Sequence, residues 1–209
     1  SDGTGYAPKY QKQQEYQWGM TLGGPIIKNK LFFFVNYENT NKTYPNLNGY
    51  RQSGSRVNPD EADDVMQKIK DMAQRQGLSY DGTFANPDIY TKSNKFGAKI
   101  DWNINDFNKF SFRWSYVDAK QLNVVSSASS LNDDHYYFPF TSKTNSFTAE
   151  LQSRLSPVVS NEARVSYVRV RDKRNVSSAF PMISLQVTGG SVNIGNERSS
   201  MANSLDQDI

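Results

Sequence analysis

The sequence predicts an all-β fold built from three antiparallel hairpins. In each hairpin, one alternating strand leads through a turn of a few residues into a second alternating strand, whereas the connections between hairpins are far longer. The six expected strands cover residues 14–23, 31–41, 95–103, 109–119, 146–156 and 161–173. Short turns at one end of a sheet and long loops at the other are typical of bacterial outer-membrane β-barrels. We therefore predict a segment of a transmembrane antiparallel β-barrel.

Apolar and polar residues alternate along four of these strands, so one face of each strand is apolar and would meet lipid in a barrel. The lipid-facing candidates are Tyr16, Trp18, Met20, Leu22, Phe96, Ile100, Trp102, Phe110, Phe112, Trp114, Tyr116, Phe147 and Leu151. The opposite face carries charges of both signs, such as Lys99, Asp101 and Arg113, as a wet or plugged lumen would. Phe32 and Phe34 also fall on this polar face, where we expect them to pack against something inside the barrel, such as a plug.

An antiparallel β-sandwich is the alternative fold, because its strands also alternate between apolar and polar residues. The mixed charges at mid-strand favour the barrel. So does the strand length of about 10 residues. A tilted strand needs this length to cross a bilayer, and most strands have only about five or six residues. A soluble or surface-anchored sandwich that binds glycans or a protein partner stays open at this point.

The strand expected at residues 161–173 changes phase near Tyr167, where apolar residues switch to the opposite positions from Val168 onward. If the alternation runs on unbroken, Arg169 and Arg171 share the face of Tyr167 and point outward at the membrane rim. If a β-bulge near Tyr167 shifts the phase, both arginines point inward and line the pore mouth. A solvated strand end is the third possibility.

The composition excludes several classes of protein. The chain of 209 residues contains no cysteine, which excludes disulfide scaffolds and cysteine nucleophiles. Its net charge of +3 is carried by scattered residues, so we expect no nucleic-acid partner. A mean hydropathy of -0.72 is compatible with a barrel, whose inward positions are polar and whose loops are solvated. No nucleophile elbow, dinucleotide fingerprint or zinc-binding helix motif is present, so we expect neither an enzyme nor a cofactor.

One helix is expected in the long loop at residues 43–94. Asn58 suits the N-cap, Pro59 suits the first helical position, and two acidic residues follow in the first turn. Apolar residues then recur at helical spacing until Gly77, which is a stop signal. The expected helix covers residues 59–76 and most simply supports the loop's own small core.

The loops also carry the candidate ligand contacts. The loop at residues 121–143 places Asp133 and Asp134 beside the single histidine, but a metal site needs three or four converging ligands, so we expect no metal here. An aromatic and acidic loop tip could instead touch a sugar or a peptide, or rest on the barrel rim. The ligand-contact candidates are His135, Tyr136, Tyr137, Phe138, Tyr44 and Tyr50. Residues 188–195 resemble a phosphate loop only in their glycines, and we expect them to form a plain loop.

Three segments resemble a known family. Residues 23–38, GGPIIKNKLFFFVNYE, resemble the early-barrel hairpin of TonB-dependent outer-membrane transporters. The nearest group is the Oar-like and SusC-like receptors with an N-terminal carboxypeptidase-regulatory-like domain. Residues 96–106, FGAKIDWNIND, with residues 109–114, KFSFRW, resemble the next hairpin of this family, and residues 156–162, SPVVSNE, resemble a later turn and the start of a strand.

The resemblance implies an importer in the outer membrane of a Gram-negative bacterium, with a barrel of about 22 strands around a plug. The ligand would be a peptide, a glycan or a siderophore-type molecule. Short turns would face the periplasm and long loops the exterior. The implied partners are outer-membrane lipid and lipopolysaccharide, the rest of the barrel and its plug, TonB through an N-terminal region, and a surface lipoprotein lid.

The sequence departs from the family pattern because it contains neither a TonB box nor a plug. About six strands cannot close so large a barrel, and an open sheet edge is not tolerated in lipid. We therefore expect residues 1–209 to be one part of a larger barrel. A barrel of this family that has lost transport and serves in adhesion or signalling is a further alternative.

Overall fold

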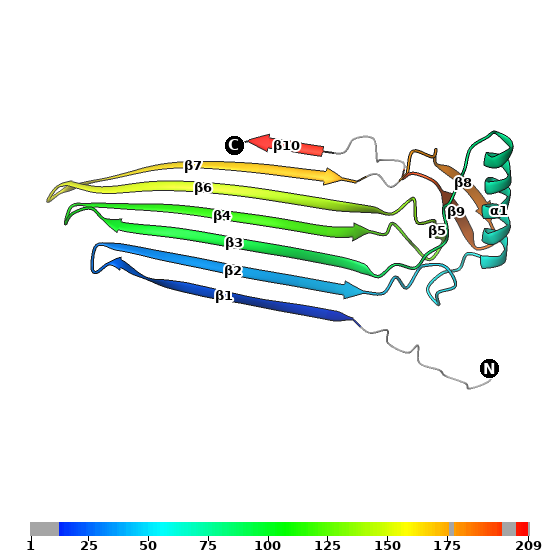
Figure 1. The fold of residues 1–209 in the computed structure, drawn as a ribbon, viewed down its shortest axis with the longest axis horizontal. Coiled ribbons are helices and arrows are strands. Elements are labelled where there is room, and N and C mark those ends of the chain that lie inside the picture. The colour runs from blue at the N-terminus through cyan, green and yellow to red at the C-terminus, as the bar shows by residue number, and fades with distance from the viewer. Residues whose placement is uncertain (1–12, 176–177, 198–203, 209) are drawn as a thin grey trace, which may run out of the picture.

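The structure is a computed structural model that describes residues 13–175, 178–197 and 204–208. Its main element is an antiparallel sheet of seven strands in the order β1-β2-β3-β4-β6-β7-β10 (Figure 1). These strands are β1 (Gln14–Ile27), β2 (Leu31–Tyr44), β3 (Ile89–Asn103), β4 (Asn108–Asn123), β6 (Phe138–Ser156), β7 (Val159–Arg174) and β10 (Ser204–Asp208). The order of the strands in the sheet follows their order in the chain, as successive hairpins require.

The six expected strands are all present, and each is longer than its sequence pattern indicates. β6, for example, has 19 residues, although a tilted strand crosses the hydrocarbon region with about 9–11. The added residues lie mostly at the loop ends, where polar residues replace the apolar alternation. The strands therefore have enough length to extend beyond a bilayer on the side of the long loops.

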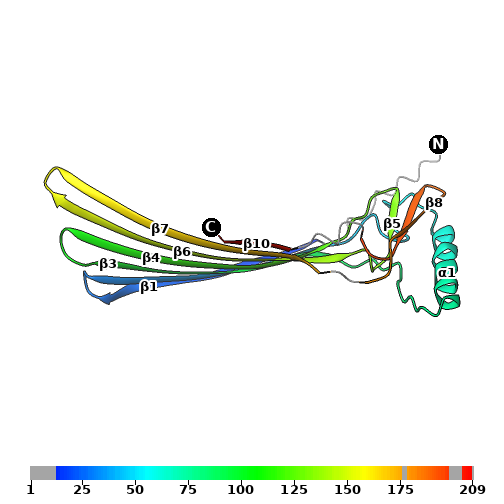
Figure 2. The ribbon, with the colours of Figure 1, turned by 90° about the horizontal axis from the view of Figure 1, so that it is seen from above.

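The sheet is a single curved layer (Figure 2). In the described part of the chain, no other sheet or helix packs on either of its faces. A β-sandwich requires a second sheet on the apolar face, so the sandwich alternative is wrong. No helix in this part of the chain has the length and apolarity to span a membrane.

The turns at one end of the sheet are short, and local side chains fix their shape. The β1–β2 turn contains Asn29, which adopts a positive φ of 60°; asparagine tolerates this conformation better than most residues. In the β3–β4 turn the Asn105 side chain accepts hydrogen bonds from the backbone N–H groups of Phe107 and Asn108, both at 2.9 Å. Such side-chain turns are favoured by asparagine.

The long loops fold together at the other end of the sheet. We call residues 45–88, 124–137 and 178–197 the loop domain. It contains helix α1 (Pro59–Arg75) and a second sheet with the order β5-β9-β8, made of β5 (Ser130–Asn132), β8 (Ile183–Val187) and β9 (Gly190–Ile194). Ala62, Ile69, Leu131 and Val192 belong to its buried core. All three loops therefore contribute to one small hydrophobic core.

Helix α1 ends one residue earlier than expected and is capped as the sequence indicates. The Asn58 side chain accepts hydrogen bonds from the backbone N–H groups of Asp60 and Glu61, at 3.0 and 3.3 Å. Residues 188–195, expected to be a plain loop, instead contain the β8–β9 turn and strand β9. Gly189 and Gly190 have φ values of 86° and 155°, which permit this tight turn.

Candidate functional site

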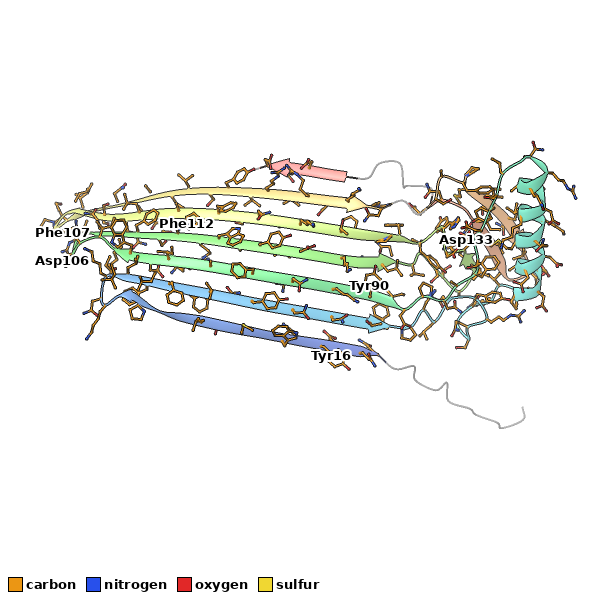
Figure 3. The ribbon with its side chains drawn as sticks, in the orientation of Figure 1. Tyr16, Tyr90, Asp106, Phe107, Phe112 and Asp133 are labelled. Atoms are coloured by element: carbon orange, nitrogen blue, oxygen red, sulfur yellow. The ribbon has the colours of Figure 1, made fainter. Side chains whose placement is uncertain are left out.

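The register of the main sheet places the apolar residues of successive strands on one face. Residues that are Cα partners in a sheet point to the same side. Phe96 on β3 is the partner of Tyr37 on β2 and of Tyr116 on β4, and Phe147 on β6 is the partner of Trp114 on β4. All thirteen lipid-facing candidates lie on this face, which we call the apolar face. Figure 3 shows the side chains along both faces of the sheet.

Aromatic side chains form a nearly continuous row across the apolar face. The rings of Trp114 and Phe147 stack with centroids 6.3 Å apart, as do those of Phe147 and Tyr167, and the Phe96 and Trp114 rings lie 5.1 Å apart. At the β1 edge, the Trp18 side chain is 52% exposed. A sheet face this apolar needs a nonpolar environment, and lipid would supply one.

The apolar band crosses the sheet obliquely. Its end nearer the loop domain lies at Tyr16 on β1, at Tyr37 on β2 and at Tyr167 on β7. Through the strand pairings, Tyr37 lies level with Met20, and Tyr167 lies level with Leu22. Barrel strands are tilted and staggered, so a band parallel to the membrane must cross the register in this way. The slope fits tilted strands in a bilayer.

The opposite face, which we call the polar face, carries cross-strand ion pairs. Lys95 on β3 lies 2.6 Å from Glu38 on β2, and Arg164 on β7 lies 2.8 Å from Glu150 on β6. These pairs are largely solvent-exposed, so each contributes little to stability. Phe34 is on this face opposite Gly23 and is 44% exposed. Nothing in the described part of the chain covers it, and its predicted packing against a plug stays a prediction.

The phase change in β7 does not involve a bulge at Tyr167. The β6–β7 register is continuous from Phe140 to Arg154, and its one shift lies between Arg154 and Ser156, near the turn. Arg169 and Arg171 therefore share the apolar face with Tyr167, at the end of the strand nearer the loop domain. Arg169 lies 3.7 Å from Asp208 on β10, and Arg171 forms an ion pair with Asp206.

The six ligand-contact candidates do not form one surface. Tyr136, Tyr137 and Phe138 are 9%, 4% and 5% exposed. The Tyr137 hydroxyl donates to the carbonyl of Asn132 at 3.0 Å, and burial raises the pKa of this hydroxyl. These three aromatic side chains lie in the interior at the base of the loop domain. They therefore leave little exposed surface for a ligand to contact. Their role in ligand contact stays a prediction that this burial disfavours.

Tyr44 and Tyr50 are the more accessible candidates. Tyr44 ends β2 and is 36% exposed. The Tyr50 hydroxyl donates to Asp63 at 2.6 Å and accepts from the Arg51 guanidinium at 2.8 Å. The hydrogen bond to the Asp63 carboxylate raises the pKa of Tyr50. This polar cluster links the loop before α1 to the helix itself.

Asp133 is the centre of a buried polar network that the sequence analysis missed. Its carboxyl group is fully buried, accepts a hydrogen bond from the Tyr80 hydroxyl and accepts another from the Tyr136 backbone N–H at 3.1 Å. The Gly195 N–H donates to the Tyr80 hydroxyl at 2.9 Å. Burial raises the pKa of Asp133 to about 7, although the hydrogen bonds from backbone N–H groups lower it. Asp133 thereby joins the three loops.

His135 lies at the edge of this network. Its Nε2 atom is 3.1 Å from the Asp81 carboxylate, and its ring packs edge-on against Tyr80 with centroids 5.0 Å apart. Among the residues that the structure describes, no group of three or more His, Asp or Glu side chains converges as a metal site would. The pair of carboxylates beside the histidine is used for structure: Asp134 binds the Thr83 backbone and hydroxyl at 2.8 and 2.9 Å.

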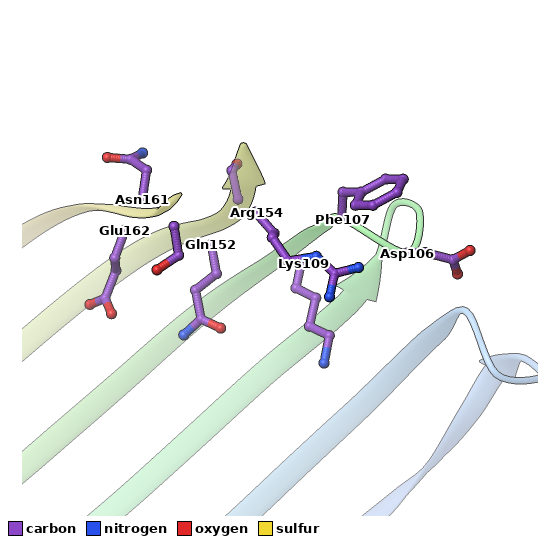
Figure 4. Close-up of a pocket in the computed structure, with 9 residues that line it drawn as sticks. Asp106, Phe107, Lys109, Gln152, Arg154, Asn161 and Glu162 are labelled. Atoms are coloured by element: carbon purple, nitrogen blue, oxygen red, sulfur yellow. The ribbon is translucent and has the colours of Figure 1, made fainter. Parts of the chain in front are cut away.

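An open pocket lies at the short-turn end of the polar face. It has a volume of about 530 Å³ and is lined by Asp106, Phe107, Lys109, Arg154 and Glu162, among others (Figure 4). The Arg154 guanidinium lies over the Phe107 ring, 5.1 Å from its centroid. The lining mixes charges of both signs. The pocket lies at the end of the sheet opposite the loop domain.

Comparison with known proteins identifies the class of this chain. The chain matches the family described as outer membrane beta barrel domain over residues 3–51 and 39–205. No curated protein and no solved structure matches. The matched ranges cover most of the sheet and the loop domain, and they agree with a single-layer antiparallel sheet that has one apolar and one polar face. The chain therefore belongs to the outer membrane β-barrel domain family and is located in the outer membrane of Gram-negative bacteria.

Proposed function

We propose that this chain is part of the barrel wall of a TonB-dependent transporter that imports a peptide, glycan or siderophore-type ligand. Three segments that resemble this family, residues 23–38, 96–114 and 156–162, support the proposal. They form the turn ends and mid-strand regions of three successive hairpins in the sheet. TonB would act through an N-terminal region, and a plug would occupy the space beside the polar face.

The observation that carries the proposal is that the two edges and the polar face of the sheet are uncovered. In the part of the chain that the structure describes, the outer edges of β1 and β10 have no partner strand. Unpaired backbone groups are very costly in lipid, so further strands must continue the sheet on both sides. The exposed Phe34 on the polar face, beside charges of both signs, suits contact with a domain inside a wide barrel.

A crosslinking experiment in cells tests the proposal. In the whole protein that carries this chain, a photoreactive phenylalanine analogue replaces Phe34, in strains with and without TonB. We expect Phe34 to crosslink within the same polypeptide, to a domain inside the barrel, with a pattern that changes when TonB is absent. The matched control at Phe112, on the apolar face, should crosslink lipid in both strains. A Phe34 pattern that is identical without TonB would contradict the transport proposal.

The second candidate function is a barrel without transport that serves in adhesion or signalling. The compact loop domain favours it, because a folded outer domain can bind a partner without any path through the barrel. This function predicts a Phe34 crosslink that does not respond to TonB and a loss of binding to cells when residues 45–88 are deleted. In both functions we expect no enzymatic activity, no cofactor and no nucleic-acid partner.

A further inference from the structure

Basic side chains occur at a constant spacing from aromatic residues of the apolar face, on the side of the loop domain. On four neighbouring strands of the sheet, β3, β4, β6 and β7, a basic residue lies four positions past an aromatic residue, toward the loop domain. The pairs are Phe96 and Lys92 on β3, Tyr116 and Lys120 on β4, Phe147 and Lys143 on β6, and Tyr167 and Arg171 on β7. An even spacing keeps both members of each pair on the same face. We call Lys92, Lys120, Lys143 and Arg171 the basic belt.

The register places like charges of the belt directly opposite each other. Lys92 is the Cα partner of Lys120, and Lys143 is the Cα partner of Arg171. Like charges at directly opposite positions of an antiparallel pair destabilise it. An arrangement of this kind is stable when an anion lies between the two cations, because the anion replaces repulsion by two attractions.

The belt is only partly neutralised by the protein itself. Lys143 lies 3.9 Å from Asp118, and Arg171 forms an ion pair with Asp206. Within the described residues, no carboxylate lies within salt-bridge distance of Lys92 or Lys120. Lys92 instead lies over the Tyr90 ring, with its Nζ atom 5.3 Å from the centroid. The two directly opposed lysines therefore have unmet positive charge on the outward side of the sheet.

The height of the belt matches the headgroups of the outer leaflet. Aromatic residues of a membrane barrel gather at the interfaces. Four strand residues span about 13 Å, which a tilt of about 40° reduces to about 10 Å along the membrane normal. The belt thus lies just beyond the hydrocarbon region on the side of the long loops. In the outer membrane this layer contains the phosphate groups of the glycolipid.

We propose that the basic belt is a binding site for the phosphate groups of the outer-leaflet glycolipid, centred on Lys92 and Lys120. The glycolipid's acyl chains would lie against the aromatic row, and its phosphates would lie between the opposed lysines. The proposal rests on the outer-membrane location of the chain and is independent of whether the barrel transports a ligand.

The test measures how much glycolipid stays bound to the whole protein extracted from outer membranes in mild detergent. The belt variant is Lys92→Gln/Lys120→Gln/Lys143→Gln. The charge-matched control is Lys28→Gln/Lys30→Gln/Lys68→Gln, whose lysines are exposed at a short turn and on helix α1. Native mass spectrometry counts the glycolipid molecules per protein, and purified glycolipid is added back to obtain the affinity.

We expect the belt variant to lose affinity by about fivefold for each lysine removed, whereas the control keeps the affinity of the unchanged protein. Added inorganic phosphate at millimolar concentration should not release the glycolipid. A second variant, Asp118→Asn, removes the carboxylate beside Lys143 and should bind glycolipid more tightly. Equal affinity of the belt variant and the control overturns the proposal. If the belt variant fails to fold, an Asp118→Asn affinity no higher than that of the unchanged protein overturns it instead.

Discussion

Phe112 lies in the middle of the apolar face, with apolar residues on both neighbouring strands. It is the Cα partner of Ile100 on one side and of Ala149 on the other, and its ring lies 6.4 Å from that of Phe147. Its neighbour Ser111 points to the polar face, opposite Glu150. Two adjacent residues of one strand therefore face two different solvents.

This contrast predicts opposite outcomes for the same substitution. Phe112→Arg should destabilise the barrel by about 2–4 kcal/mol, because arginine near the bilayer midplane is costly. Ser111→Arg, the control, should change stability little, because the new charge faces Glu150. Unfolding by denaturant in lipid vesicles measures both. A similar loss of stability in the two variants would contradict the assignment of the faces.

Asp133 gives the loop domain a dependence on pH whose sign follows from its burial. The folded state holds this carboxyl with a pKa of about 7, whereas the ordinary value is 3.8. Between these two values the folded state binds a proton that the unfolded state has released, so stability falls as the pH rises from about 4 to about 7. Above pH 7 the group is ionised in both states and contributes no further change.

We expect the loop domain to be more stable at pH 5 than at pH 8, with a difference on the order of a few kcal/mol or less. Hydrogen exchange of residues 57–80, corrected for the intrinsic effect of pH, measures this. Asp133→Asn should abolish the difference, because the amide does not titrate, and Asp88→Asn, in an exposed part of the loop domain, should leave it unchanged. Protection that rises with pH would contradict this account.

Residue positions on the strands could be predicted from the sequence, whereas those in the loops could not. The thirteen lipid-facing candidates lie on one face because strand alternation is local information. The burial of Tyr136, Tyr137 and Phe138 depends on packing with two other loops, about which a run of aromatic residues contains no information. The basic belt was also missed, although the spacing of four residues between an aromatic and a basic residue was visible in the sequence.

At the scale of elements, helix α1 shows how a local signal and a distant contact combine. Asn58 caps the helix through its side chain, and its backbone N–H donates to the carbonyl of Thr188 at 2.9 Å. Glu61 accepts a hydrogen bond from the Thr188 N–H at 2.8 Å, which lowers the pKa of this carboxyl. The start of the helix is thus joined to the β8–β9 turn.

Asn58→Ala should therefore destabilise the loop domain by about 1 kcal/mol, the usual cost of losing an N-cap. Asn58→Asp should restore most of the stability, because aspartate caps a helix as well as asparagine does. Hydrogen exchange in the first turn of α1 distinguishes the two variants. Equal exchange in Asn58→Ala and the unchanged protein would show that the cap contributes nothing.

The helix was predictable and the small sheet was not. The helix has a cap, a proline at its first position, a periodic apolar stripe and a stop signal, all within about 20 residues of sequence. Strand β5 has three residues, and β8 and β9 have five each. Runs this short show no clear alternation. The parallel pairing of β5 with β9 joins residues 61 positions apart, from Leu131 to Val192, and no local pattern indicates it.

At the scale of the whole molecule, the sheet has the local order of a barrel without its closure. Closed barrels have no unpaired edges, and the described strands leave two. We therefore expect the protein extracted from outer membranes to be a species several times larger than the 23.7 kDa of this chain, with peptides of this chain inside it. Intact-mass measurement followed by peptide mapping tests this. A stable, water-soluble species of 23.7 kDa would contradict it.

The molecule also has two regions whose apolar side chains leave water in different ways. The core of the loop domain excludes water in the ordinary way, with Ala62, Val192 and Ile194 fully buried. The sheet has no interior of its own and depends on lipid for its apolar face. Sequence patterns revealed the lipid-dependent part, because its order repeats along each strand. The loop core is assembled from three distant segments, so it became visible only in the structure.

The joining of three loops has a mechanical consequence. Backbone hydrogen bonds tie the first loop to the second, from Arg56 to Ala128, the first to the third, from Asn58 to Thr188, and the second to the third, from Asp133 to Asn193. Three separate loops could each bend with their own degrees of freedom. Because hydrogen bonds join each loop to the other two, one loop can move outward only if these bonds break or the other loops move with it. A molecule that displaces one of the loops must therefore do more work than it would against a separate loop.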